Sequence, residues 1–378
     1  MSAIIYVLEF IMKLIGIITV GRVDWNIWKS IIKSFENKNQ FKLKIIALGM
    51  HFNRRYGMSY KNIKKVGHKI DEKIKVKFGT SSPENISYQY SEYSNKFSKI
   101  FKKNKFDFMC IVGDRFESLA AASICSFYSI PIIHFHGGEK SEGSLDDSYR
   151  HAISKLSHVH LVSNELFKKR LVQLGEERWR IKVVGAPGID NLRSEKYISK
   201  KKFYDKFKLN KNCKNILVLL NAETLDSHKN EKNTEILIKS IVNLNYNFLF
   251  TLPNFDLGSS LIRKILSKYK KKKNIKLIKT LGDDFASALK HVDLVLGNSS
   301  AGIIETGFFK VPTINIGKRQ NGRIFGKNII NIPFKKSLIL KYIDYALSKK
   351  FKKKIRNMNN PYGNGFSHLK IKKEIKFY

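Results

Sequence analysis

Candidate catalytic side chains stand directly after two short apolar segments in the first half of the sequence. These segments, 106–112 and 131–135, predict buried parallel strands, and the small residues between them predict a helix. In open α/β sheets, ligands bind at the carboxyl ends of the strands. The polar residues that follow therefore predict one crevice that holds acids and bases together, and the candidates are Asp114, Glu139, Asp146, Asp147 and Arg150.

Each acid in this group has a chemical and a structural interpretation. Asp114 follows a strand and a glycine, so it could remove a carbon-bound proton or cap the next helix. Glu139 follows two glycines, which allow a ligand to approach the backbone. Neighbouring carboxylates would raise the pKa of Glu139 and make it an acid; a solvated side chain in a turn is the alternative. Asp146 and Arg150 lie four residues apart, on one face of a helix, either as a surface pair or as an acid with its orienting arginine.

A second candidate site lies in the other half of the sequence, at 297–305. The segment GNSSAGIIE follows a predicted strand and opens a helix, and backbone N–H groups of small residues at a helix start bind anions. A plain capping segment is the alternative. Arg22, after the first strand, is a further candidate phosphate contact, with a pair to Asp24 as its alternative. The candidates for holding a diphosphate and a ribose are Ser299, Ser300, Gly302 and Glu305.

Two alternations of buried-type strands and helices must position these groups. Apolar runs such as 14–20 predict strands that are covered on both faces of a parallel sheet. The first alternation ends near 188–191, and the second begins at 215–220 after a polar, Lys-rich connection. We therefore predict an α/β fold of two Rossmann-like, doubly wound domains that face each other across a cleft. The expected domains are 12–191 with the acids, 192–350 with the anion site, and a segment 351–378 that packs back on the first domain.

Composition favours an anionic small-molecule partner over nucleic acid. The chain has 378 residues and a formal net charge of +40, from 71 Lys and Arg against 31 Asp and Glu. Such an excess also occurs in nucleic-acid-binding proteins. Here the lysines are spread over nearly every expected surface, and no finger, helix-turn-helix or aromatic-rich RNA motif accompanies them. We therefore expect no nucleic-acid partner but an attraction for anionic substrates.

Cysteine usage and the N-terminus bear on location. The three cysteines have no metal-ligand spacing, so we expect a reduced cytoplasmic protein without structural zinc. The apolar segment 1–12 is too short to span a bilayer, and Glu9 interrupts it, so we expect no stable membrane insertion. We expect translation to start at Met12; a short N-terminal helix on the body or on a membrane surface is the alternative.

A series of segments resembles the hydrolysing UDP-N-acetylglucosamine 2-epimerase family, most closely the branch that serves sialic- and legionaminic-acid synthesis. The segments are TVGRVDW (19–25), GMH (49–51), GDRFESLAAAS (113–123), HFHGGEKSEGSLDDSYRHAISKLSH (134–158), VVGAPGIDN (183–191), PNFDLGS (253–259), GNSSAGIIE (297–305), INIGKRQNGR (314–323) and NPYGNG (360–365). Together they extend over nearly the whole chain. The resemblance implies a GT-B fold, a nucleotide-sugar substrate, a reaction without metal or nicotinamide cofactor, and a homodimer.

The resemblance also implies roles for single positions. Asp114 matches the family's first acid. The second acid falls in the loop of Glu139, but the wider family carries a Glu nearer His136, so the acting position stays open. Asp146 or Asp147 matches the third acid, beside Arg150. The nucleotide site matches Ser299, Ser300, Gly302 and Glu305, with Arg22 near the phosphates, and other motif positions expected to bind substrate are His51, Asn221, Asn254 and Arg323.

One position departs from the family pattern. Relatives carry His-Pro or Gly-His after the first strand of the second domain, where this chain has Asn221-Ala222. An asparagine can donate a hydrogen bond to a phosphate oxygen but carries no charge, so stabilisation of the leaving group would be weaker. His228 lies seven residues further on and could substitute.

The implied reaction converts a nucleotide-linked N-acetylhexosamine and water to the free 2-epimer and the nucleotide diphosphate through a glycal. Asp114 is the preferred base at C2, and Glu139, Asp146 or Asp147 would protonate C2 on the opposite face. The sugar stays open between N-acetylglucosamine and a diacetamido-trideoxyhexose, linked to UDP or GDP. The alternatives are a GT-B glycosyltransferase and a catalytically impaired nucleotide-sugar-binding homologue.

Overall fold

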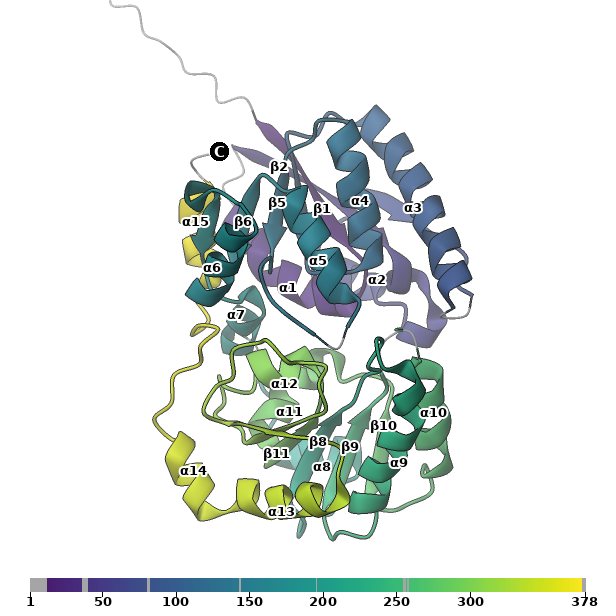
Figure 1. Cartoon of the computed structure of the whole chain (residues 1–378), viewed down its shortest axis with the longest axis vertical. Helices are drawn as coiled ribbons and strands as arrows, with labels where there is room; N and C mark the ends of the chain where they lie inside the picture. Colours follow the sequence, from purple (N-terminus) through teal and green to yellow (C-terminus); the bar gives the residue numbers. More distant parts are fainter. Residues whose placement is uncertain are drawn as a thin grey trace, which may run out of the picture.

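The chain forms two parallel β-sheets, each enclosed by helices, that occupy the two halves of the molecule in Figure 1. The computed structural model describes residues 12–35, 40–79, 82–142, 144–194, 196–253, 256 and 258–375. The expectation about a start at Met12 concerns residues 1–11, which lie outside the described residues.

The first sheet has seven strands in the order β3-β2-β1-β4-β5-β6-β7, and every neighbouring pair is parallel. Its strands are β1 (Lys13–Thr19), β2 (Phe41–Leu48), β3 (Glu72–Ile74), β4 (Phe108–Val112), β5 (Ile132–Phe135), β6 (Val159–Val162) and β7 (Ile181–Val183). Its helices are α1 (Arg22–Ile32), α2 (Tyr60–Lys65), α3 (Pro83–Lys103), α4 (Phe116–Phe127), α5 (Asp146–Lys155), α6 (Glu165–Gln173) and α7 (Pro187–Ser194).

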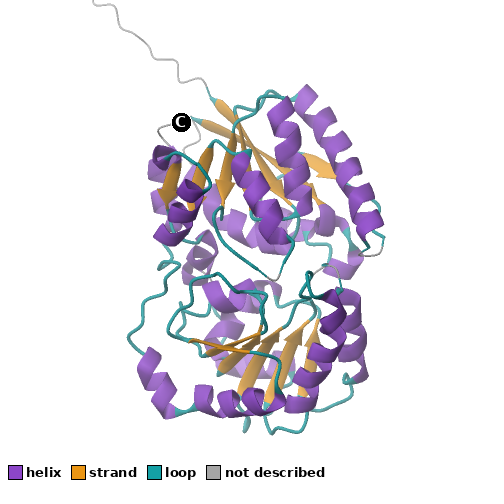
Figure 2. Ribbon diagram, in the orientation of Figure 1, coloured by secondary structure: helices purple, strands orange, loops and turns teal. Residues whose placement is uncertain are grey.

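The second sheet has six parallel strands in the order β10-β9-β8-β11-β12-β13. The strands are β8 (Asn215–Leu219), β9 (Asn247–Thr251), β10 (Ile275–Ile278), β11 (Leu294–Gly297), β12 (Thr313–Ile316) and β13 (Ile329–Ile332). The helices are α8 (Lys200–Phe207), α9 (Asn230–Ile241), α10 (Ser259–Lys268), α11 (Phe285–His291), α12 (Ser300–Ile304), α13 (Lys336–Leu347) and α14 (Lys349–Ile355). Figure 2 shows both sheets with their covering helices and confirms the predicted doubly wound α/β architecture.

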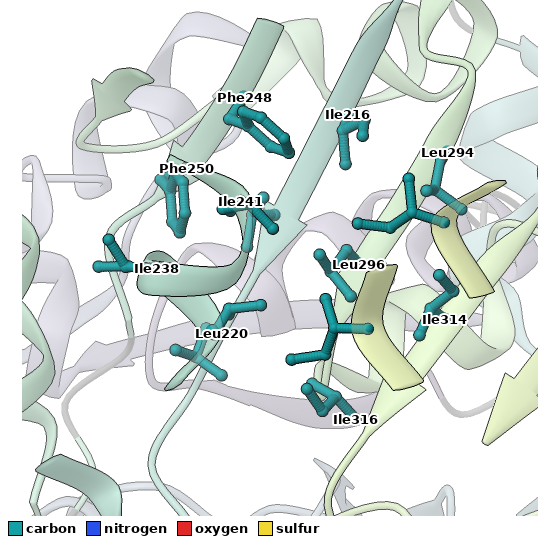
Figure 3. Packing of buried hydrophobic residues seen from close by; sticks show 14 of the residues in the cluster. Ile216, Leu220, Ile238, Ile241, Phe248, Phe250, Leu294, Leu296, Ile314 and Ile316 are labelled. Atoms are coloured by element: carbon teal, nitrogen blue, oxygen red, sulfur yellow. The ribbon is translucent and has the colours of Figure 1, made fainter. Parts of the chain in front are cut away.

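The core lies on both faces of each sheet because the strands are apolar throughout. In β1, Ile15 and Ile17 join one cluster, whereas Ile18 joins the cluster on the opposite face. In the second domain, alternate residues of β8, β9, β11 and β12 pack against α9 and α13. Figure 3 shows Phe248, Leu296 and their strand neighbours beside Ile238 and Ile241 of α9. Each such buried side chain contributes about 1.5–3 kcal/mol of transfer free energy. Doubly covered strands of this kind hold the loops at their carboxyl ends in place.

The last helix, α15 (Ser367–Ile375), returns to the first domain after α13 and α14 have covered the second. In Figure 1, α15 lies beside the first domain, far from α13 and α14. Its Ile371 and Ile375 pack into the same hydrophobic cluster as Ile15 and Ile17 of β1. The carboxylate of Asp190 in α7 accepts hydrogen bonds from the backbone N–H groups of Ser367 (3.0 Å) and His368 (2.7 Å) at the start of α15.

Three local features differ from the sequence-based expectation. The edge strands β3 and β13 carry no continuous apolar run. β13 buries one of its four residues, so its sequence lacks the pattern of a doubly covered strand. The chain at 336–355 forms two helices and not one, because Ser348 ends α13 and caps α14 by accepting a hydrogen bond from Phe351 N–H (3.2 Å).

Candidate active site

The topology places the predicted sites at the switch point of each sheet. Each sheet reverses its strand order between its first and fourth strands, β1 and β4 or β8 and β11, and crevices for ligands open there. In the second domain the two strand ends are tied together: Asn221 N–H donates to Asn298 Oδ1 (2.7 Å), and Asn298 Nδ2 donates to Asn221 O (2.9 Å). Asn298 was not anticipated, although it directly precedes the predicted serines.

A pocket lies between the domains at this point. The first domain lines it with Arg22, Val23, Asn26, Ile27, His136, Ala186 and Gly188. The second domain lines it with Leu219, Asn221, Thr251, Leu252, Thr280, Leu281, Gly282, Phe285, Ser299, Ser300, Ala301, Ile304 and Glu305. The pocket therefore brings together five of the expected binding residues: Arg22, Asn221, Ser299, Ser300 and Glu305.

The chemistry of the pocket changes along its wall. Leu281 and Phe285 form an apolar part of the wall, whereas Arg22 contributes a guanidinium group. Burial lowers the pKa of Arg22. Among the described residues, Arg22 makes no ion pair with Asp24, whose carboxylate accepts a hydrogen bond from Val20 N–H (3.0 Å). A Cβ on Gly188 would stand 3.1 Å from Glu305 Oε1, so the missing side chain lets the Glu305 carboxylate approach α7.

Arg150 gathers the acids of the first domain. Its side chain is 1% exposed, and it donates hydrogen bonds to Asp114 Oδ2, to Asp147 Oδ1 (2.8 Å), to the carbonyl of Glu139 (3.1 Å) and to Ser141 Oγ (3.2 Å). The expected pairing of Arg150 with Asp146 is wrong: α5 turns Asp147, one turn away, toward the guanidinium. Asp114 keeps 27% of its side chain exposed, whereas Arg150 is buried.

Glu139 is held as a carboxylate, contrary to the expectation of a raised pKa. Burial raises its pKa, but the positive charge of Arg323, then His136 and Arg150, lower it far more, so the net shift is strongly downward. Arg323 Nη1 donates to Glu139 Oε2, and Glu139 Oε1 lies 2.7 Å from His136 Nδ1 and accepts from Ser163 Oγ at 3.3 Å. Arg323 therefore spans the two domains to hold Glu139 and does not line the pocket, where we had expected it to bind the substrate.

Asp146 and Asp147 have opposite electrostatic surroundings. Burial, followed by the charges of Asp114 and Asp256, raises the pKa of Asp146 to about 7. For Asp147, burial raises the pKa, but His151 and Arg150 outweigh it and lower it overall. Asp146 is thus the carboxyl that holds a proton near neutral pH.

Asp146 also faces charges of the second domain that the sequence did not single out. Arg319 Nη2 lies 3.8 Å from Asp146 Oδ2 and 3.7 Å from Asp256 Oδ2. Asp256 in turn lies 3.8 Å from Arg115 of the first domain. The basic run after β12 (KRQNGR) was the available signal, but the pairing of its arginines requires both domains.

Two further expected binding residues, His51 and Gly302, do not line the pocket. His51 is fully buried, with Nε2 2.9 Å from Thr19 Oγ1 and Nδ1 2.9 Å from Ser59 Oγ, and burial lowers its pKa to about 3. Gly302 faces the sheet, since a Cβ there would lie 3.6 Å from Thr313 and Val295. Asn254 lies outside the described residues. His51 and Gly302 thus contact neighbouring elements of their own domains.

His136 is a pocket residue to which sequence reasoning assigned no role. It follows β5 in a left-handed conformation with φ +66°, which is costly for a residue other than glycine and is typical of functional sites. The signal in the sequence was a histidine placed directly before Gly137-Gly138.

The described residues contain no group of three or more His, Cys, Asp or Glu side chains arranged to hold a metal ion. Within the same described part of the chain, no helix combines the length and the apolar character needed to cross a membrane.

The fold is of the GT-B type. The crystal structure of UDP-GlcNAc 2-epimerase from Neisseria meningitidis bound to UDP-GlcNAc superposes with a TM-score of 0.82, at 17% identity, over 97% of this chain and 100% of that one. The Methanocaldococcus jannaschii UDP-GlcNAc 2-epimerase in complex with UDP-GlcNAc and UDP gives 0.79, at 21% identity, over 97% and 100%. At these identities the similarity shows the fold alone.

Sequence comparison shows the family. The family described as UDP-N-acetylglucosamine 2-epimerase matches residues 33–376, so this chain belongs to that family of enzymes. The chain is 36% identical, over 84% of its length and 83% of the relative's, to the GDP/UDP-N,N'-diacetylbacillosamine 2-epimerase (hydrolyzing) of Campylobacter jejuni. It is 32% identical to the UDP-N,N'-diacetylbacillosamine 2-epimerase (hydrolyzing) of Legionella pneumophila, over 92% and 91%. It is also 32% identical to the polysialic acid biosynthesis protein P7 of Escherichia coli, over 93% and 90%.

Proposed function

We propose that this protein is a hydrolysing 2-epimerase that converts a nucleoside-diphosphate-linked 2-acetamido sugar to the free 2-epimer and the nucleoside diphosphate. The observation that carries the proposal is the meeting of two sites. A pocket with an arginine, two serines and a carboxylate lies where the domains face each other, and the Arg150-centred acids of the first domain adjoin it through His136 and Glu139.

In this proposal the pocket holds the nucleotide. The apolar part at Leu281 and Phe285 receives the base, and the Glu305 carboxylate accepts hydrogen bonds from the ribose hydroxyls. Arg22 and the backbone N–H groups at Ser299 and Ser300 face the diphosphate. Because Asn221 is neutral, Arg22 supplies the positive charge in the pocket that stabilises the departing diphosphate.

The reaction proceeds by elimination followed by hydration. Asp114 accepts the C2 proton as the C1–O bond breaks; the C2–H electron pair forms the C1=C2 bond, and the C1–O pair leaves on the diphosphate. Water then adds its oxygen to C1 while a proton reaches C2 from the opposite face. Arg150 orients Asp114 for the first step.

Two sugars fit this proposal, and the relatives favour one. Two of the relatives described above, from Campylobacter jejuni (36% identity) and Legionella pneumophila (32%), are named for nucleotide-linked N,N'-diacetylbacillosamine. A Neisseria meningitidis relative at 32% identity is named UDP-N-acetylglucosamine 2-epimerase. We therefore rank UDP- or GDP-linked N,N'-diacetylbacillosamine first and UDP-N-acetylglucosamine second.

The test incubates the purified protein with each nucleotide sugar alone in deuterated water and reads the products by NMR. We expect free 2-epimer that carries deuterium at C2, together with nucleoside diphosphate. A nucleotide-linked 2-epimer would indicate a non-hydrolysing reaction, whereas turnover that requires an added acceptor would indicate a glycosyltransferase. If nucleotide sugar binds but no substrate is converted, the chain is a binding homologue.

Asp114→Asn tests the base directly. The variant keeps the shape of the side chain but cannot accept the proton, so we expect product formation to fall by about 10²–10⁴-fold. The affinity for UDP, measured by calorimetry, should stay within a few-fold because Asp114 does not line the nucleotide pocket. Wild-type turnover by this variant would remove Asp114 from the role.

Location and assembly complete the proposal. We propose a cytoplasmic homodimer without a nucleic-acid partner. Light scattering tests the dimer by measuring the molar mass in solution. Tight binding of random DNA at physiological salt would contradict the proposal that the protein has no nucleic-acid partner.

A further inference from the structure

Within the described part of the chain, His136 has one ring nitrogen that is paired and another that is buried without a partner, and among the histidines of this kind it is the one that lines the pocket. Its Nδ1 lies 2.7 Å from Glu139 Oε1, whereas its Nε2 is shielded from solvent and has no hydrogen-bond partner among the described residues. Buried polar atoms nearly always have a partner, so an orphaned one requires an explanation. His136 lines the pocket between the domains, so a ligand in that pocket can supply the missing partner.

Glu139 determines which nitrogen of His136 is available. Arg323 lowers the pKa of Glu139 and keeps it ionised, so this carboxylate can only accept a hydrogen bond. The proton of the contact must therefore sit on His136 Nδ1. That leaves Nε2 as the atom that gains or gives up a proton.

The acids of the first domain are gathered around one guanidinium. Asp114 and Asp146 are close enough for each charge to act on the other, and Arg150 binds Asp114 and Asp147 with a single guanidinium. Inversion at C2 requires a second group on the opposite face. Glu139 is fully paired and cannot donate a proton, whereas the neighbouring His136 lines the pocket with a nitrogen that has no partner among the described residues.

We propose that His136 is the catalytic residue that protonates C2 and that Glu139 is its positioning residue; this inference rests on the proposed function. In the hydration step the Nε2–H bond breaks and its proton bonds to C2 with the electron pair of the C1=C2 bond. The oxygen of water bonds to C1, and the surplus proton of that water passes to solvent. Solvent then reprotonates Nε2.

The decisive variants are His136→Gln and His136→Asn. Glutamine keeps a polar side chain that does not titrate, and asparagine tolerates the left-handed backbone at this position. Because elimination does not need His136, both variants should release nucleoside diphosphate and accumulate the unsaturated sugar. Formation of the 2-epimer should fall by about 10²–10⁴-fold. NMR of the products gives the ratio of unsaturated sugar to 2-epimer.

Glu139→Gln tests the positioning role. A glutamine cannot hold the proton on His136 Nδ1 as a carboxylate does, so we expect the pH profile of 2-epimer formation to change and the share of unsaturated sugar to rise. A merely structural role would leave this profile in place. Glu142→Gln is the matched control, because Glu142 lies in the same loop in an exposed pair with Lys140 and should change neither readout.

His158→Gln is the control for His136, because His158 is exposed and stands before β6, at the end of the sheet opposite to the site. Rates are compared per folded protein, with thermal unfolding as the measure of folding. The proposal is overturned if folded His136→Gln or His136→Asn forms 2-epimer within fivefold of wild type, or loses both products equally without unsaturated sugar. If wild type itself converts no nucleotide sugar, the proposed function fails instead.

Discussion

At the scale of single residues, the site is organised by a contrast between acids whose pKa values are lowered and acids whose pKa values are raised. Glu139 and Asp147 have lowered pKa values because arginine and histidine side chains outweigh the effect of their burial. Asp146 and Asp24 have pKa values raised to about 7, mainly because burial penalises their charge. Groups of the second kind are costly to ionise, so the stability of the fold must depend on pH.

The pH dependence of stability should show this. A carboxyl whose folded-state pKa is raised to about 7 contributes stability below its unfolded value, near 4, and loses that contribution as pH rises through 7. We expect Asp146→Asn to raise the free energy of unfolding by about 1–2 kcal/mol at pH 8 and to change little at pH 4. Urea unfolding at both pH values measures this. Asp205→Asn, at an exposed side chain, is the control, and an equal effect of Asp146→Asn at both pH values would contradict the expectation.

At the scale of elements, α15 depends on a residue far away in the sequence. Asp190 of α7 accepts hydrogen bonds from two N–H groups at the start of α15, from His368 Nδ1 (2.8 Å) and from Ser30 Oγ of α1 (2.9 Å). A single buried carboxylate therefore holds three helices together. The positions of α1 and α7 matter for the site, because both line the pocket.

Asp190→Asn tests this anchor. Its new NH₂ group would face N–H donors that now bind a carboxylate, so we expect a loss of about 2–4 kcal/mol in unfolding free energy. Limited proteolysis should cut first near residues 360–366. Glu374→Gln in the same helix removes only the partly exposed pair with Lys182 at 3.5 Å and should cost less than about 0.5 kcal/mol. Equal effects of the two variants would contradict the anchoring role.

At the scale of the whole molecule, charged side chains of each domain form ion pairs with the other domain. Arg323 binds Glu139, Arg319 approaches Asp146, and Asp256 approaches Arg115. A hydrogen bond to the backbone adds to these ion pairs: Arg170 of the first domain donates to the carbonyl of Gly322 in the second (2.6 Å). The structure is thus a closed arrangement in which domain contact and the ionisation of the site depend on the same residues.

Arg323→Gln should open the molecule. Without Arg323, Glu139 is a buried charge that lacks its main partner. This destabilises the closed arrangement by about 3–5 kcal/mol, and separation of the domains would return Glu139 to water. We expect a larger radius of gyration by small-angle scattering and a return toward the wild-type value when UDP is added. Lys29→Gln removes a more exposed pair across the same interface, Lys29–Asp283 at 3.6 Å, and should leave the radius unchanged. An unchanged radius in Arg323→Gln would contradict this account.

The sequence alone determined the two-domain α/β architecture, because doubly covered parallel strands such as β1 and β8 are apolar runs that local composition reveals. It also indicated Asp114, Arg150 and the serines after β11, since they follow strand ends where ligands bind. It could not show that Asp147 and not Asp146 meets Arg150, that Arg323 crosses to Glu139, or that His136 is left with an open nitrogen. Only the tertiary structure decides these pairings, because a pKa and an ion pair depend on burial and on charges that arrive from the other domain.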